Sequence, residues 1–292
     1  MTSAVNTFLE NIRPRAARLV EACGRLLYPP HCAVCGRSAD EHEDRYLCRD
    51  CIGAINFVQE PTCPKCGHEL GPFTKQAKRC INCRNTPLRF DRAVAAAHHA
   101  GAARDLLLAF KFAAQKQNAF PLAKLLAARL QETEIPEQVQ LIVPVPLHRS
   151  RQRSRGFNQS RSLAERLGER LSLMVAPRVL RRVVNTPPQS RGMSLASRRA
   201  NVKGAFVVPS PRAVTGKSVL LIDDVLTTGA TASECAGVLK RAGVKKVYVA
   251  TVTRRVRTPP QQLEGEEPVM RYEIEAAVPT PDELGPGPSP SA

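Results

Sequence analysis

From residue 90 onward, short apolar runs alternate with segments whose apolar residues recur at helical spacing. Strands are predicted at 92–99, 141–147, 219–222 and 245–253. Helices are predicted at 102–112, 120–130, 158–171 and 231–242. The run Val219–Ile222 is apolar on both faces, which favours a buried parallel strand. Strands that alternate with helices in this way are typical of an α/β fold with a Rossmann-like parallel sheet.

Some stretches carry weaker patterns. Residues 4–27 alternate apolar and basic groups at near-helical spacing interrupted by Pro14, which predicts one helix or two broken helices packed on the next module. A helix on a membrane surface is the less favoured alternative, because the apolar face is short and broken. Residues 180–206 predict neither a good strand nor a long helix. Lys111, Lys116 and Lys124 are expected on the solvated side of the helices near them.

The net charge of the chain favours a polyanionic ligand. The chain of 292 residues has a formal net charge of +17 and lacks Trp. Residues 258–292 hold seven acids against Arg271, a net of −6, which leaves +23 on residues 1–257. Such a charge favours a phosphorylated or polyanionic partner, while a merely basic surface is the alternative. The acidic, Pro-rich segment 258–292 is expected to be disordered.

No N-terminal basic region precedes an apolar stretch, and no apolar run approaches the ~18–20 residues that span a bilayer. We therefore expect a cytoplasmic protein without membrane insertion.

Eight of the ten cysteines form four Cys-x-x-Cys pairs, which in a reducing compartment favours metal binding over disulfides. Two structural Zn²⁺ ions are predicted, each in four thiolates, and iron is the alternative metal. The spacing permits sequential sets or a crossed arrangement that uses the same residues. His31, His42 and His68 are expected at the surface rather than as ligands, and Cys23 and Cys235 in buried helix positions. The predicted ligands are Cys32, Cys35, Cys48, Cys51, Cys63, Cys66, Cys80 and Cys83.

The strand 219–222 runs into Asp223 and Asp224, followed by the small, hydroxyl-rich segment 227–231 and a predicted helix. Open α/β sheets bind ligands at the carboxyl ends of their strands, and a helix N-terminus favours phosphate. An acidic pair that caps the helix or holds a metal is the alternative interpretation.

Arginine is concentrated in the middle of the chain. Residues 144–201 contain thirteen Arg, no Lys and only two acids, Glu165 and Glu169. The planar guanidinium grips phosphate oxygens in pairs, so the cluster indicates phosphate recognition. A genome that favours Arg codons would explain the choice over Lys, although it would not explain the clustering.

The stretch 218–231 resembles the phosphoribosyl-pyrophosphate (PRPP) motif of type I phosphoribosyltransferases, and its Asp pair is the catalytic candidate. The resemblance implies that Asp223 and Asp224 bind the ribose hydroxyls of Mg²⁺–PRPP and that residues 227–231 hold the 5′-phosphate. The implied PRPP-binding residues are Asp223, Asp224, Val225, Thr227, Thr228, Gly229, Ala230 and Thr231. The implied pyrophosphate loop comprises Val145, Pro146, Leu147, His148, Arg149, Arg151 and Arg155. In such proteins a mobile loop, here within 180–206, closes over PRPP.

Further motifs narrow the resemblance. The double zinc ribbon, Val143-Pro-Val-Pro146, Arg155-Gly-Phe-Asn-Gln159, Thr186-Pro-Pro-Gln189 and Arg198–Phe206 together resemble the ComF family of competence-associated proteins over roughly residues 25–255. Membership implies a role in DNA uptake, with single-stranded DNA and a helicase-like ATPase as partners. Phosphoribosyl transfer remains the enzymatic hypothesis, although no motif identifies an acceptor. A non-catalytic DNA-binding protein or an adaptor is the alternative.

The expected organisation has four parts. These are a helical segment at 1–28, a double zinc ribbon at 29–88, a phosphoribosyltransferase domain at 89–257 and the tail at 258–292. Phe157 and Phe206 flank the Arg-rich segment, and both are expected in the core rather than as stacking platforms.

Overall fold

A computed structural model of the chain describes residues 31–39, 46–71, 79–112, 115–186 and 195–255. The predicted helical segment 4–27, the tail 258–292, Cys23 and His42 lie outside the described residues. Among the described helices, none is both long and apolar enough to cross a membrane.

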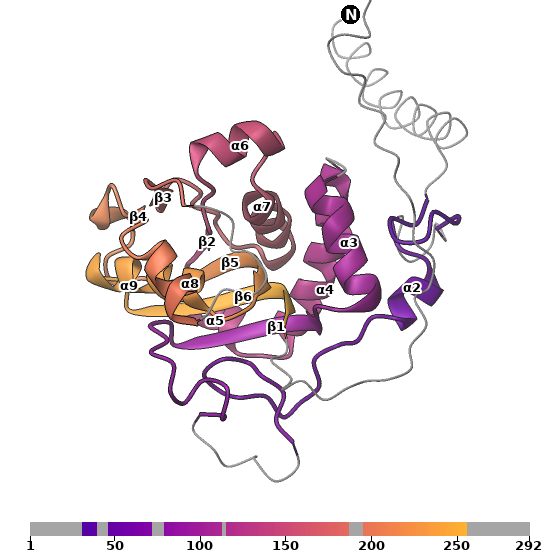
Figure 1. Ribbon diagram of the computed structural model, residues 1–292, viewed down its shortest axis with the longest axis horizontal. Helices are drawn as coiled ribbons and strands as arrows, with labels where there is room; N and C mark the ends of the chain where they lie inside the picture. The colour runs from indigo at the N-terminus through magenta and orange to yellow at the C-terminus, as the bar shows by residue number, and fades with distance from the viewer. Residues whose placement is uncertain (1–30, 40–45, 72–78, 113–114, 187–194, 256–292) are drawn as a thin grey trace, which may run out of the picture. The chain divides into compact units, whose positions relative to one another are not determined.

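The framework is a four-stranded parallel sheet in the order β1-β6-β5-β2 (Figure 1). Its strands are β1 (Arg92–His98), β2 (Leu141–Pro144), β5 (Ser218–Leu226) and β6 (Lys246–Arg254). All four predicted strands are thus confirmed. The strand β2 ends at Pro144, inside the predicted range 141–147, because proline cannot sustain a central ladder. The strand predicted at 219–222 continues as β5 through the acidic pair to Leu226. Backbone pairing of Asp223 and Val225 to β6 fixes the strand on both sides of Asp224.

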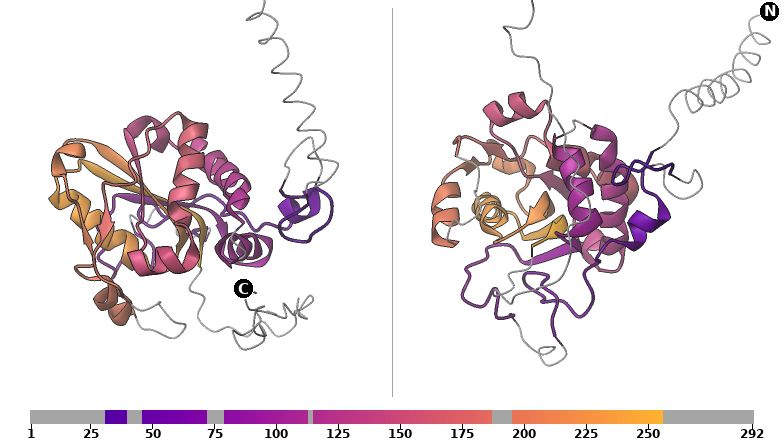
Figure 2. Two further views of the ribbon diagram at one scale, coloured as in Figure 1. Left: turned by 90° about the horizontal axis from the view of Figure 1, so that it is seen from above. Right: turned by 45° about the vertical axis from the view of Figure 1, so that its right-hand side comes forward.

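Helices cover both faces of this sheet (Figures 1 and 2). The period-two alternation of a strand sends Leu220 and Ile222 into one core cluster and Val219 and Leu221 into the other. The first cluster includes side chains of α3 (Gly101–Phe112), α4 (Ala119–Gln131) and α7 (Gln159–Leu171). The second cluster includes those of α9 (Ala230–Arg241).

The predicted helices are confirmed to within one residue at each end, and a side-chain cap defines the start of α7. Asn158 precedes α7, and its side chain accepts a hydrogen bond from the backbone N–H of Arg161 at 3.3 Å. Phe157 lies in the core, 7% exposed, with its ring 5.4 Å from that of Phe110.

The remaining described elements are short. They are α2 (Arg49–Gly53), η1 (Lys116–Asn118), α5 (Ile135–Gln138), α6 (Arg149–Arg155), β3 (Arg181–Arg182), α8 (Leu195–Val202), β4 (Phe206–Val207) and η2 (Pro211–Ala213). The strands β3 and β4 pair antiparallel outside the main sheet, and Phe206 is buried as predicted.

The segment 149–155 corrects one expectation. We expected it to belong to a loop after β2, whereas it forms helix α6. His148 caps the helix by accepting from the backbone N–H of Ser150 at 3.3 Å, and Gly156, with a φ of 73°, ends it. Arginine has good helix propensity, so a run that looks like a basic loop satisfies the requirements of a short exposed helix.

Candidate active site and metal centres

Asp223 and Asp224 lie near the carboxyl end of β5, where three neighbouring groups hold them. The Ser160 hydroxyl and the backbone N–H of Asp224 both donate to Oδ1 of Asp223, each at 3.0 Å. Nζ of Lys111 lies 2.5 Å from Oδ2 of Asp224. The acidic pair therefore receives its partners from α3, α7 and its own strand.

Lys111 corrects a second expectation. We placed its side chain on the solvated side of its helix, but it is only 18% exposed and forms an ion pair with Asp224. The helical pattern shows which face is apolar. It does not show that the last turn of α3 ends beside the carboxyl end of β5.

Burial and the neighbouring Asp224 carboxylate together raise the pKa of Asp223 to about 7. The hydrogen bonds from Asp224 and Ser160 and the charge of Lys111 act in the opposite direction but do not cancel the increase. A ligand that brings positive charge or hydrogen-bond donors would stabilise the ionised pair.

The segment after the acidic pair forms a tight turn into α9. Gly229 has a φ of 74°, and a Cβ there would lie 3.1 Å from Cδ2 of Leu88, so glycine fits both the backbone and the space. The Thr228 hydroxyl accepts from the backbone N–H of Ala230 at 3.3 Å. The Ser233 N–H donates to the Gly229 carbonyl at 2.8 Å. The backbone N–H groups of Thr231 and Ala232 precede the first such bond of the helix and are suited to bind an anion.

One cleft collects most of the predicted ligand-binding residues. Its lining from β5 and α9 comprises Asp223, Asp224, Val225, Thr227, Gly229, Ala230 and Thr231. Val145, Pro146, Leu147, Arg151 and Arg155 line it from the segment after β2. Three predicted residues lie elsewhere: Thr228 lines a second cavity, Arg149 a third, and His148 caps α6.

Lys111, Gln159, Ser160 and Arg182 also line the cleft, and sequence reasoning did not assign them to it. Gln159 is 2% exposed, and its buried Nε2 has no hydrogen-bond partner among the described residues. A buried amide without a partner is costly, so this donor suits an acceptor on a bound ligand. The motif Arg155–Gln159 pointed at this region of the chain, but no local pattern pointed at Lys111 or Arg182.

The cysteines form two separate tetrads in sequential order. In each set, one Sγ atom per residue lies within 4.8 Å of the other three. The sets are Cys32, Cys35, Cys48 and Cys51, and Cys63, Cys66, Cys80 and Cys83. The crossed arrangement is thereby excluded.

The geometry of both tetrads fits zinc. Tetrahedral Zn²⁺ with bonds of ~2.3 Å requires sulfur atoms about 3.8 Å apart. The Sγ separations are 3.7 Å for Cys35–Cys48, 3.7 Å for Cys63–Cys83 and 3.5 Å for Cys66–Cys80. Gly36 and Gly67 adopt φ values of 72° and 66°, as the knuckle turns require.

Neither tetrad includes a histidine. His31 is exposed as expected, whereas His68 is partly buried and its Nδ1 has no partner among the described residues. Burial lowers the pKa of His68. Cys235 is fully buried, as predicted.

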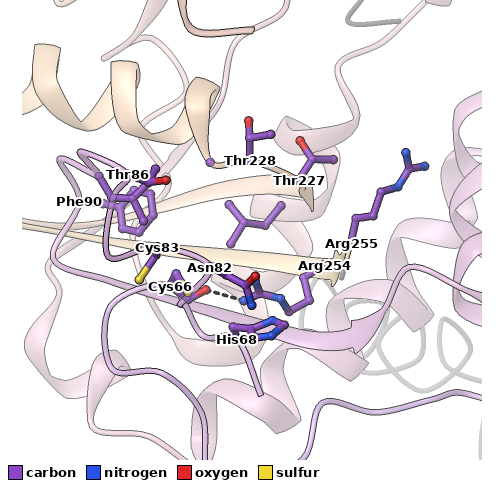
Figure 3. Close-up of a pocket in the computed structure, with 13 residues that line it drawn as sticks. Cys66, His68, Asn82, Cys83, Thr86, Phe90, Thr227, Thr228, Arg254 and Arg255 are labelled. Carbon is purple, nitrogen blue, oxygen red and sulfur yellow. Dashed lines mark hydrogen bonds between the residues drawn. The ribbon is translucent and has the colours of Figure 1, made fainter. Parts of the chain in front are cut away.

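The second ribbon packs directly behind the turn 227–229 (Figure 3). Cys66 and Cys83 line one side of a small cavity, and Thr227 and Thr228 line the other. Arg254, 5% exposed, donates from Nη1 to the Cys66 carbonyl at 2.5 Å. The second cysteine tetrad and the residues that flank the turn 227–229 thus belong to the same hydrophobic core.

Family models describe both parts of this arrangement. A double zinc ribbon domain matches residues 23–85, and a phosphoribosyl transferase domain matches residues 113–276. The fold and the cysteine centres therefore define a phosphoribosyltransferase-fold protein with an N-terminal double zinc ribbon.

Comparison with three curated relatives shows which family within this class the chain belongs to. The chain is 34% identical over 212 residues to competence protein F of Haemophilus influenzae, covering 71% of this chain and 90% of that protein. It is 32% identical to the DNA utilization protein YhgH of Escherichia coli (strain K12), with the same shares covered. It is 27% identical to competence protein ComFC of Streptococcus pneumoniae, covering 76% of this chain and 99% of that protein. The chain belongs to the competence protein F (ComF) family.

Among solved structures, the chain is similar to purine phosphoribosyltransferase from Pyrococcus horikoshii Ot3. The identity is 19%, the TM-score is 0.29, and 53% of this chain and 93% of that one are covered. A similarity at this level carries no information on substrate.

Proposed function

We propose that the cleft binds Mg²⁺–PRPP and that this binding serves a role in DNA uptake. The juxtaposition of an acidic pair, a glycine turn at a helix N-terminus and a basic wall at the carboxyl edge of the sheet supports the proposal. In this proposal Asp223 and Asp224 bind the ribose hydroxyls, and residues 227–231 bind the 5′-phosphate. Arg151 and Arg155, with Val145, Pro146 and Leu147, bind the pyrophosphate.

The donor groups of the cleft suit magnesium bound together with PRPP. Mg²⁺ prefers oxygen ligands and commonly binds through one or two carboxylates, waters and the phosphates of a substrate. Asp224 is already paired with Lys111, so the ligand has to share or displace that ammonium group. When bound, Mg²⁺ would neutralise charge on the pyrophosphate.

The protein's own residues suit a transfer reaction in which pyrophosphate leaves the ribose. The negative charge that builds up on the leaving group would be met by Arg151 and Arg155, which line the cleft. Gln159 would donate to a ligand oxygen, and Ser160 would hold the Asp223 carboxylate in place. The acceptor is to be found by screening nucleobases, amines and DNA for release of pyrophosphate.

The names of the relatives support the biological part of the proposal. They include competence protein F and a DNA utilization protein, and the chain covers 90% of each. We therefore place PRPP binding by this chain in the handling of DNA that enters the cell, with single-stranded DNA and a helicase-like ATPase as partners.

Calorimetric titration with Mg²⁺–PRPP tests the site. The double substitution D223N/D224N removes both negative charges at nearly constant volume and is expected to abolish measurable binding. The matched control is D105N, because Asp105 is 51% exposed and pairs only with its neighbour Arg104 among the described contacts. Unchanged affinity in D223N/D224N would refute the assignment.

A further inference from the structure

The third cavity, which Arg149 lines, lies on the other side of the segment after β2, and five arginines line it. We call it the arginine basin and define it by Arg149, Arg161, Arg178, Arg181 and Arg182. Its volume is about 1100 Å³, including the solvent space at its open mouth. The arginines come from α6, α7 and the segment that ends in β3.

Positive charge in the basin exceeds the negative charge nearby. Among the described residues that line it, none is acidic. Arg161 pairs with Glu165 one turn along α7, at 2.8 Å between Nε and Oε1. Arg149, Arg178 and Arg181 are exposed, so their guanidinium groups are accessible to a ligand.

Arg182 is the least exposed of the five arginines in the basin. Burial and the neighbouring Arg151 lower its pKa, and its Nε is buried without a partner among the described residues. Its Nη2 donates to the Thr186 hydroxyl, and its guanidinium lies 5.4 Å from the centre of the Phe206 ring. The charge of Asp223 in the neighbouring cleft opposes the lowering of its pKa. An anion would satisfy both the charge and the unpartnered donor.

The rest of the lining indicates more than inorganic phosphate. Pro146, Leu147, Pro177, Leu180 and Pro209 give the basin an apolar part beside its arginines. An inorganic phosphate gains nothing from contact with apolar side chains. A nucleotide carries a flat base next to its phosphate, and the faces of that base can pack on apolar side chains. An arginine guanidinium group can bind either part of a nucleotide, because it donates hydrogen bonds to phosphate and its flat face stacks on a base.

The basin adjoins the candidate PRPP cleft. Pro146, Leu147 and Arg182 line both cavities. A ligand in the basin would therefore lie next to the place proposed for pyrophosphate.

We propose that the arginine basin is a second ligand site, which binds a nucleotide or a single-stranded nucleotide chain through its phosphates while PRPP occupies the neighbouring cleft. The ligand's link to DNA uptake rests on the proposed function, but the site itself rests on the basin's residues. A concave site of this size suits single nucleotides or an unpaired strand, because the convex surface of a duplex cannot enter it.

The test is fluorescence anisotropy with a labelled oligodeoxythymidylate on the full chain. The variant R178A/R181A removes two exposed arginines that line the basin and not the PRPP cleft. We expect binding at low salt to weaken about tenfold, and the slope of log affinity against log salt to become shallower by about 1.4, the value for two lost phosphate contacts to a single strand. Thermal unfolding and the affinity for Mg²⁺–PRPP are expected to stay unchanged.

The matched control is R241A/K245A, which removes the same charge from exposed residues that line neither the basin, the PRPP cleft nor the cavity beside Thr228. Less than a twofold effect is expected. Equal weakening by both double variants would mean that only net charge matters, and an unchanged R178A/R181A would mean that the basin binds nothing. Either result overturns the proposal.

Competitors identify the ligand class. Displacement of the probe by ATP assigns the basin to a mononucleotide, and displacement only by unlabelled oligonucleotide assigns it to a strand. Inorganic triphosphate competing as well as ATP would overturn the nucleotide part of the proposal. D223N/D224N separates the two proposals, because it is expected to lose PRPP binding and to keep the probe.

Discussion

Asp223 is held where its charged form is disfavoured. Its carboxyl is enclosed by the sheet and lies beside a second carboxylate, and these two causes raise its pKa to about 7. Such a residue lowers the stability of the free protein at neutral pH, which is common where a site is built for a ligand rather than for the fold. Ser160 and the Asp224 backbone keep the carboxyl oriented without removing the cost.

This cost predicts a pH-dependent effect of D223N on stability. A raised carboxyl pKa means that the folded state holds a proton which the unfolded state has lost, so wild-type stability falls as pH rises from 3.8 to about 7. D223N has no carboxyl group to titrate at this position, so the pH-dependent decrease in stability that Asp223 causes is absent. Relative to wild type it is expected to gain about 1–3 kcal/mol at about pH 8 and to gain little at about pH 4.

Urea unfolding of both proteins at the two pH values measures the difference. D105N is the control, with no expected pH-dependent gain, since Asp105 is about half exposed. An equal effect of D223N at both pH values would contradict the raised pKa.

At the scale of elements, the two zinc ribbons have different neighbours. The residues after the second tetrad lie under α9: the Arg89 backbone N–H donates to the Ser233 hydroxyl at 3.0 Å, and Leu88 lies against Gly229. Gly67 packs so closely on Ala93 of β1 that a Cβ would lie 2.4 Å from the Ala93 carbonyl oxygen. Buried residues of the first tetrad instead belong to the core cluster of α3, α4 and α7.

The difference predicts unequal effects of losing each zinc. C83S is expected to lower the zinc content from two to about one per chain and to weaken Mg²⁺–PRPP binding about three- to tenfold, because the turn 227–229 loses its support. C35S is expected to lose zinc equally while PRPP affinity changes less than twofold. Metal analysis and calorimetry of the same samples provide the measurement, and equal losses of affinity would show that the second ribbon has no special role.

At the scale of the whole molecule, charge is separated along the chain. The net charge is +17, made of +23 on residues 1–257 and −6 on residues 258–292. A strongly basic protein attracts polyanions over a distance set by the ionic strength, and an acidic segment of the same chain competes for that attraction.

Deletion of residues 258–292 tests this competition. Affinity for the labelled oligonucleotide is expected to rise about three- to tenfold at low salt, and the difference is expected to vanish at high salt, where screening removes the attraction. Mg²⁺–PRPP affinity serves as the internal control and should change little. A deletion that leaves oligonucleotide affinity unchanged at every salt concentration would show that the acidic segment has no shielding effect.

Local patterns predicted much of this molecule. The four strands of the main sheet and the helices α3, α4, α7 and α9 follow from apolar periodicity, because the elements of a buried parallel sheet repeat that pattern over several residues. Segment 149–155 was missed as a helix because it has no apolar stripe, and its cap, His148, is not a strong sequence signal. The candidate site is a prediction still to be tested, although the cleft does bring together most of its residues.

The sequence by itself determined the α/β class, the eight metal-binding cysteines and the acidic pair followed by a small turn. Each of these depends on the pattern of residues that are close together along the chain. Only the tertiary structure decided that the tetrads are sequential, that Lys111 pairs with Asp224, and that Gln159 and Arg182 lie in the cleft. It also gathered arginines from 149 to 182 into one basin. These facts depend on where distant elements meet at the carboxyl edge of the sheet, and no spacing along the chain encodes that meeting point.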